Sequence, residues 1–309
     1  MTSIRLLLPL LGLALCCSAA AAGDRIKVVT TTSDLRSLVQ EVGKERVEAI
    51  NLAPPTQDVE AYEPRPQDAQ KLRDAKLVVR IGLDYDLWFN RLLVDASPDL
   101  RRGGKGYVDA SIGVPLLEIR AVSFDATPGH SHGAGNPHYW LDPANAEVIT
   151  GGIMEGLIRI DPDRAQTYAS NRNAFLARLK PKIEEWRRKL ERFAGAPVIA
   201  YHNSWPYLAR RFRLNIIDSI EPKPGIAPSP SHLAGLIKKM QERRVAIIIK
   251  QPFEPEQTPK MLAERAGALV VPLAPSVGSV PGIDDYLALI EYDVTLLAIA
   301  FEDRRRGKP

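Results

Sequence analysis

Two short segments contain the histidines best placed to do chemistry. They are Asn136–Pro143, which includes His138, and Tyr201–Trp205, which includes His202, in a chain with only five histidines. His202 directly follows an apolar run, which places it just past the carboxyl end of an expected strand, where open α/β sheets bind ligands. A neutral imidazole can donate a nitrogen lone pair to a divalent metal ion. The two segments therefore predict a metal site.

Glu60 is the third candidate ligand. It lies in a loop after the apolar run that ends at Leu52, and its carboxylate is a hard oxygen donor. Each candidate alone has an ordinary alternative: a solvated glutamate for Glu60, a surface histidine beside a helix start for His138, and a core or outer-shell histidine for His202. A metal site requires that the three groups converge from different loops.

Four further residues are weaker candidates. His130 and His132 form a glycine-flanked pair that either captures metal before delivery or lies solvated in a loop. His232 falls in the first turn of a helix expected from about Ser231 to Arg243, and we expect it to be exposed. Glu221 is either an additional carboxylate ligand or one partner of a structural ion pair.

The first 22 residues have the pattern of a secretory signal. Met1–Arg5 is short and basic, Leu6–Cys17 is apolar, and Ser18–Ala22 is small, as signal cleavage requires. We therefore expect a periplasmic mature protein, with acylation of a cysteine as the alternative. Both cysteines of the chain lie in the apolar run and would be removed with the signal, so a metal bound by the mature protein would have only nitrogen and oxygen ligands.

Strand and helix patterns alternate along the chain, which favours the α/β class with parallel sheets. Strands are predicted from β-branched apolar runs at Ile26–Thr30, Val47–Leu52, Leu77–Ile81, Val198–Tyr201, Ile216–Ile217, Ala246–Lys250 and Ala268–Leu273. With 309 residues, of which 45% are hydrophobic, we expect two lobes with separate cores.

A long helix is expected between the two sets of strands. Apolar residues recur there at steps of three and four, from Phe175 to Phe193, as one face of a helix requires. Pro181 lies inside this pattern and predicts a kink, because proline lacks the N–H group that the helix needs. The predicted organisation is a signal peptide at 1–22, an N-terminal metal-binding lobe at 23–162, a linking helix at 163–194 and a C-terminal lobe at 195–309.

These features together resemble a known family, the periplasmic zinc- and manganese-binding proteins of bacterial ABC importers, whose two lobes are joined by one long helix. The likeness covers nearly all of the expected mature chain. It rests on motifs in the same order: Tyr62–Pro66, Asn136–Pro143, Tyr201–Trp205, Glu221–Pro228 and Tyr286–Asp293. The resemblance implies a monomeric carrier, not an enzyme, that hands a divalent metal ion to an ABC permease in the inner membrane.

The chain departs from the family at two positions. Where the family typically has Asp-Pro-His, this chain has Asp58–Glu60, so the first ligand would be a carboxylate. The C-terminal aspartate ligand of the family falls on Ala274, which cannot coordinate a metal. The site that the resemblance implies consists of Glu60, His138 and His202, completed by water or by a carboxylate such as Glu221 or Asp285.

Two imidazoles and one carboxylate favour Zn²⁺, with Mn²⁺ as the alternative, since an added oxygen ligand would favour a harder cation. The same donors occur in catalytic zinc sites, so a secreted zinc-dependent hydrolase is an alternative, although no His-Glu-x-x-His motif is present. A second alternative is a binding protein that has lost its metal affinity and acts as an adhesin or accessory factor, because Glu60 and Ala274 depart from the ligands of the family. The net charge of +4 indicates no nucleic-acid partner.

Overall fold

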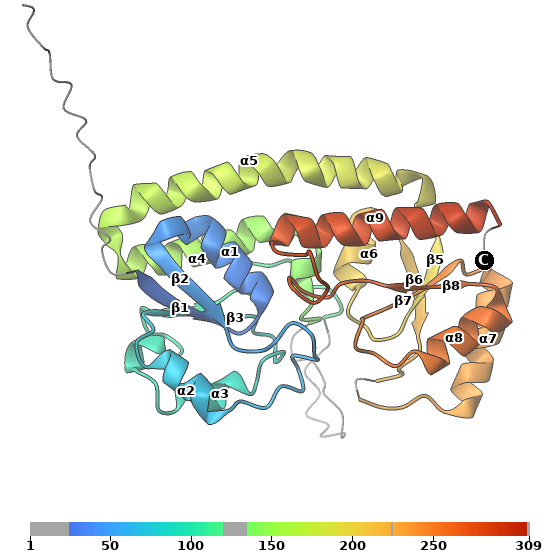
Figure 1. Ribbon diagram of the computed structural model, residues 1–309, viewed down its shortest axis with the longest axis horizontal. Coiled ribbons are helices and arrows are strands. Elements are labelled where there is room, and N and C mark those ends of the chain that lie inside the picture. The colour runs from blue at the N-terminus through green and yellow to red at the C-terminus, as the bar shows by residue number, and fades with distance from the viewer. Residues whose placement is uncertain (1–24, 120–134, 224, 308–309) are drawn as a thin grey trace, which may run out of the picture.

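The computed structural model describes residues 25–119, 135–223 and 225–307, so the expected signal peptide and the pair His130 and His132 lie outside the described residues. Within these ranges the chain forms two parallel four-stranded sheets that lie side by side with helices around them (Figure 1). This confirms the predicted α/β fold with two lobes. No helix of the described part has the length and apolar character needed to cross a bilayer.

The first sheet has the strand order β2-β1-β3-β4 and the second has the order β6-β5-β7-β8, with every neighbouring pair parallel. The strands of the first sheet are β1 (Ile26–Thr30), β2 (Val47–Asn51), β3 (Leu77–Arg80) and β4 (Tyr107–Asp109). Those of the second are β5 (Pro197–Ala200), β6 (Asn215–Ser219), β7 (Ile247–Lys250) and β8 (Leu269–Pro272). The carboxyl ends of β2 and β5 lead into the loops that contain Glu60 and His202.

Helices follow the strands in each lobe. In the first lobe they are α1 (Ser33–Gly43), α2 (Pro66–Leu72), α3 (Phe89–Leu93) and α4 (Ala146–Ile160). In the second they are α6 (Pro206–Phe212), α7 (Pro230–Arg243), α8 (Gln257–Ala266) and α9 (Tyr286–Arg305). The helix expected from about Ser231 to Arg243 is α7, and Ser229 caps it by accepting a hydrogen bond from the His232 N–H.

The long helix α5 (Ala165–Leu190) joins the lobes and passes over both of them (Figure 1). Pro181 lies inside it and does not end it. The helix packs on α1 and α4 of the first lobe and on α9 of the second. On α9, Glu291 accepts hydrogen bonds from Trp186 Nε1 at 2.8 Å and from Lys189 Nζ at 2.6 Å, which fastens the end of α5.

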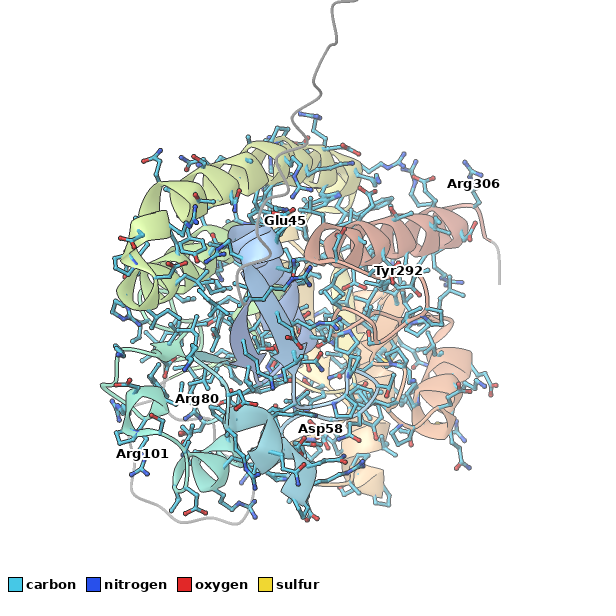
Figure 2. All side chains as sticks on the ribbon, turned by 60° about the vertical axis from the view of Figure 1, so that its left-hand side comes forward. Glu45, Asp58, Arg80, Arg101, Tyr292 and Arg306 are labelled. Atoms are coloured by element: carbon cyan, nitrogen blue, oxygen red, sulfur yellow. The ribbon has the colours of Figure 1, made fainter. Side chains whose placement is uncertain are left out.

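The expectation of two separate cores is wrong. One apolar cluster runs through both lobes, from Val28 on β1 to Phe301 on α9, and side chains fill the interior (Figure 2). The cause is the position of α5 and α9, which bury apolar side chains such as Trp186 and Leu297 behind both sheets. A smaller cluster lies beneath α7 and α8.

Two buried acids hold the segment Ala274–Val277 where the lobes meet. Asp293 on α9 accepts the N–H of Ala274 at 2.8 Å, and Asp34 on α1 accepts the N–H of Val277 at 2.9 Å. In the same segment the carbonyl of Pro275 accepts a bond from Trp140 Nε1 at 3.0 Å. Residues from three distant parts of the chain therefore fix this one segment.

The substitution Asp34→Asn is expected to flatten the pH dependence of stability between about pH 4 and pH 7. Burial raises the pKa of the Asp34 carboxyl to about 7 from its ordinary 3.8, so in this interval the folded chain keeps a proton that the unfolded chain has released. The stability that this proton contributes is present at low pH and is lost as the pH rises through the interval. Asparagine keeps the oxygen that accepts from Val277 but cannot ionise.

Urea unfolding of wild type and variant at successive pH values measures how steeply the free energy of unfolding changes with pH. Burial also raises the pKa of the Asp293 carboxyl well above its ordinary value. The variant should therefore keep the part of the pH dependence that comes from Asp293. The same substitution at the exposed Asp95 is the control. Equal slopes for Asp34→Asn and wild type would contradict the prediction.

Candidate metal centre

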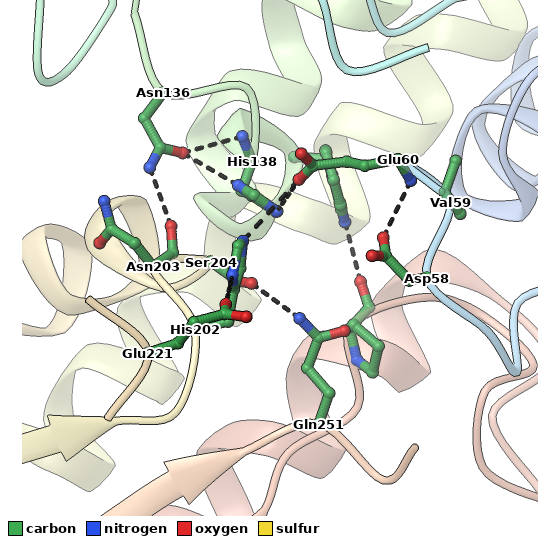
Figure 3. A network of polar contacts seen from close by, with 12 residues as sticks. Asp58, Val59, Glu60, Asn136, His138, His202, Asn203, Ser204, Glu221 and Gln251 are labelled. Atoms are coloured by element: carbon green, nitrogen blue, oxygen red, sulfur yellow. Dashed lines mark hydrogen bonds and ion pairs between the residues drawn. The ribbon is translucent and has the colours of Figure 1, made fainter. Parts of the chain in front are cut away.

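The structure brings together the three residues that the sequence singled out. One donor atom from each of Glu60, His138 and His202 lies within 4.8 Å of the other two (Figure 3). The Glu60 carboxylate oxygen Oε1 is 3.5 Å from His138 Nε2 and 3.8 Å from His202 Nε2. Glu60 and His138 come from the first lobe and His202 from the second. The group is therefore formed by loops on both sides of the junction.

The loop after β2 holds Glu60 in place through its neighbours. Asp58 Oδ1 accepts the N–H of Glu60 at 2.9 Å, which closes a tight turn. The carbonyl of Val59 accepts a bond from Trp88 Nε1 at 2.9 Å, and the ring of Tyr62 packs edge-on against Trp88 with centroids 4.8 Å apart. Figure 2 labels Asp58 where the two halves of the chain meet. These contacts aim the Glu60 side chain at the junction.

His138 is buried and oriented by Asn136. The Asn136 Oδ1 atom lies 3.0 Å from the His138 backbone N and 3.2 Å from its Nδ1. Because an amide oxygen only accepts, Nδ1 carries the hydrogen and Nε2 presents its lone pair toward Glu60. Asn136 Nδ2 in turn donates to the carbonyl of Asn203 at 2.9 Å, which links the His138 segment to the His202 segment.

His202 follows β5 and is oriented by Glu221. The Nδ1 atom of His202 is 2.6 Å from Glu221 Oε2, and the other Glu221 oxygen accepts the N–H of Gly225 at 2.8 Å. A carboxylate on Nδ1 fixes the ring and makes Nε2 a better donor to a metal. Glu221 is thus an ion-pair partner of His202, which was one of the two roles expected from the sequence.

The electrostatics of the group favour a cation. Burial raises the pKa of the Glu60 carboxyl to about 8, and the charges of Asp58 and Glu221 add to this while His202 opposes it. Burial alone would lower the pKa of His202, but the hydrogen bond to Glu221 and the charge of Glu60 raise it. Both shifts mean that these side chains hold a proton more tightly than they do in water, and a divalent ion would compete with such protons.

The spacing of the donors fits a single metal ion. Two donors bound at about 2.0–2.2 Å to the same tetrahedral ion lie about 3.3–3.6 Å apart. The distances from Glu60 Oε1 to the two imidazole nitrogens, 3.5 and 3.8 Å, are close to that edge length. The group lies in a cavity of about 430 Å³ whose wall also includes Tyr85 and Ser276. The three side chains would need to move little to enclose an ion.

Three other residues considered from the sequence lie elsewhere. His232 is half-buried and bonds through Nε2 to the carbonyl of Ser219, so it is neither fully exposed nor at the site. Asp285 caps α9 by accepting the N–H of Ala288, and it is not part of the cavity wall. Ala274 is fully buried. Neither Asp285 nor Ala274 is placed to supply a fourth ligand.

Sequence reasoning missed one acidic residue of the cavity wall, Glu254. It lies in the loop after β7, and its Oε2 accepts the N–H of Gln251 at 2.6 Å. The signal that could have found it is its place just beyond the carboxyl end of a central strand, the same argument that identified His202.

Comparison with known proteins agrees with this geometry. The family described as "Zinc-uptake complex component A periplasmic" matches residues 28–300. The high-affinity zinc uptake system protein ZnuA of Bacillus subtilis (strain 168) is 26% identical over 255 residues, which cover 81% of this chain and 78% of that protein. The iron-binding protein YfeA of Yersinia pestis is 23% identical over 285 residues, which cover 90% of this chain and 86% of YfeA.

Solved structures share the fold. A crystal structure of ZnuA superposes with a TM-score of 0.76 at 25% identity, covering 90% of this chain and 99% of that one. The solute-binding protein FpvC from Pseudomonas aeruginosa, solved in complex with Mn²⁺, has a TM-score of 0.75 at 24% identity, covering 91% and 100%. With two α/β lobes, converging donors and a match over residues 28–300, the chain belongs to the periplasmic zinc-uptake component A family of metal-binding solute-binding proteins.

Proposed function

We propose that this protein binds one Zn²⁺ ion through Glu60, His138 and His202 and delivers it, as a periplasmic monomer, to an ABC permease of the inner membrane. In this proposal residues 23–162 form the metal-binding N-terminal lobe, 163–194 the linking helix and 195–309 the C-terminal lobe. The observation that carries the proposal is the convergence of two imidazole nitrogens and one carboxylate oxygen within 4.8 Å.

The donor set supports zinc ahead of manganese. Zinc accepts imidazole nitrogens and a carboxylate oxygen in a four-coordinate shell, whereas manganese prefers more oxygen ligands in an octahedral one. At a nitrogen-containing site zinc also binds more tightly than manganese by the general order of divalent metals. Competition between the two ions for the purified protein tests this choice, and tighter binding of manganese would overturn it.

Coordination, and not turnover, is the chemistry that we infer. The cavity wall holds acidic residues that are hydrogen-bonded to backbone N–H groups or to His202, and the sequence has no His-Glu-x-x-His motif. A zinc-dependent hydrolysis of peptide or ester substrates by the purified protein would favour the alternative of a secreted hydrolase.

Zinc is expected to stabilise the folded protein. An ion that binds only the folded state adds about 2.7 kcal/mol to the free energy of unfolding when its free concentration is about 100 times its Kd. Urea unfolding with buffered zinc, and again after removal of zinc with a chelator, measures the difference. Elemental analysis should find one equivalent of zinc per chain. Loaded protein with far less than one equivalent, and no change in stability, would contradict the proposed function.

A further inference from the structure

The three proposed ligands leave the coordination shell of a zinc ion incomplete. A four-coordinate ion held by Glu60, His138 and His202 has one position left, and with Glu60 alone the inner shell retains one net positive charge. An uncompensated charge in a buried site is costly, so a second anionic ligand would stabilise the ion. The fourth ligand must come from another residue of the cavity wall or from water.

Glu254 is the acidic residue of the wall that is best placed for this role. Only 9% of it is exposed, and it lines the same cavity as the three proposed ligands. Its Oε2 atom accepts the Gln251 N–H, and among the described residues no hydrogen bond to its Oε1 is present. One carboxylate oxygen thus anchors the side chain while the other is available to a ligand in the cavity.

The other acidic residues of the wall are already engaged. Glu221 uses one oxygen for His202 and the other for Gly225. Asp58 is exposed and holds the N–H of Glu60. The buried cation nearest in sequence to Glu254, Lys250, donates to the carbonyl of Gln251 at 2.8 Å. Among the described residues, Lys250 therefore makes no ion pair with Glu254 within 4 Å and does not occupy its Oε1 atom.

The loop that carries Glu254 is tied to the loop that carries His202. Gln251 Nε2 donates to Ser204 Oγ at 2.7 Å, and both groups are buried. The backbone N–H of the same Gln251 holds Glu254. The two loops follow neighbouring strands, β5 and β7, so Glu254 and His202 approach the cavity from the same edge of the second sheet.

We propose that Glu254 is the fourth ligand of the bound cation and completes a shell of two nitrogens and two carboxylate oxygens. This inference rests on the proposed function. Glu254 is not part of the group that lies within 4.8 Å, so its side chain turns toward the ion when the ion enters. The shell is then electrically neutral, with Glu60 and Glu254 balancing the two charges of the metal.

The variant Glu254→Gln tests the inference, with Glu256→Gln as the control. Glu256 is an exposed glutamate of the following turn that pairs with Lys260. We expect Glu254→Gln to lose more than about 100-fold in zinc affinity, beyond the range for outer-shell partners. In the Co²⁺-loaded protein the visible absorption of the ion should also change. The control should match wild type in both measurements.

A crystal structure of the zinc-loaded wild type provides the second measurement, which does not depend on the variant folding. The anomalous signal of zinc should place a Glu254 oxygen at about 2.0–2.2 Å from the ion. A water molecule in that position, or a Co²⁺ spectrum and zinc affinity unchanged in Glu254→Gln, would overturn the inference and leave the proposed function intact. A wild-type protein that fails to bind zinc at all would overturn the proposed function itself.

Discussion

The substitution His138→Ala is expected to weaken zinc binding by more than about 100-fold, a larger loss than the removal of an outer-shell partner causes. The His138 Nε2 atom is 3.5 Å from Glu60 Oε1, and its ring is held by Asn136 and by the edge of the Tyr85 ring at a centroid distance of 5.2 Å. Alanine removes a pre-oriented donor that no other described histidine can replace. Competition against a chelator of known affinity measures the loss.

The matched control is His232→Ala. His232 is half-buried and hydrogen-bonded like a ligand histidine, but its partner is the carbonyl of Ser219. This variant should bind zinc as wild type does, and both variants should keep the wild-type circular dichroism spectrum. Equal losses of affinity in the two variants would refute the assignment of His138.

The substitution Asp86→Ala is expected to lower the free energy of unfolding by about 3–5 kcal/mol, because it breaks a buried ion pair and leaves a buried guanidinium without its partner. Asp86 is fully buried. Its Oδ1 accepts from Arg80 at 2.6 Å, and its Oδ2 accepts the N–H of Ile81 at 2.7 Å. Arg80 is labelled in Figure 2.

The same aspartate shapes the backbone next to the site. Gly82, Leu83 and Asp84 have φ angles of 76°, 51° and 64°, an arrangement that non-glycine residues adopt at a cost. Asp86 holds this turn by accepting the N–H of Gly82 at 3.2 Å. Because Tyr85 lies within the turn and packs on His138, Asp86→Ala should also reduce zinc affinity.

Urea unfolding monitored by tryptophan fluorescence measures the effect of Asp86→Ala. The control is Asp95→Ala, a substitution at an exposed aspartate, which should change the free energy of unfolding by no more than about 0.5 kcal/mol. A loss below about 1 kcal/mol for Asp86→Ala would indicate that the pair with Arg80 contributes little.

Local patterns predicted much of the fold. The β-branched runs such as Ile26–Thr30 became strands within a residue or two of the expected bounds, since a buried parallel strand needs continuous apolar residues. The strand Tyr107–Asp109 was not predicted, because three residues with one buried side chain form no recognisable pattern. The continuous core was also missed, because it depends on how helices pack across lobes.

The candidate site was predicted in part. Glu60, His138 and His202 were named from their motifs, and the structure brings them together, while their binding of metal stays a prediction. Their orientation could not be predicted, because it depends on partners distant in sequence, such as Glu221 for His202. Glu254 was missed because no motif marks it, although it follows a central strand as His202 does, and the structure places it in the wall of the same cavity.

The way α5 is fastened limits how the molecule can move. The helix packs on α1 and α4 at one end and is hydrogen-bonded to Glu291 of α9 at the other, so one continuous helix contacts both lobes. The helix α5 resists a wide hinge opening of the two lobes, because bending it would break its packing on α1 and α4 and on α9 at once. In the proposed function, entry and exit of the ion therefore depend on small displacements of the loops that carry Glu60 and Glu254.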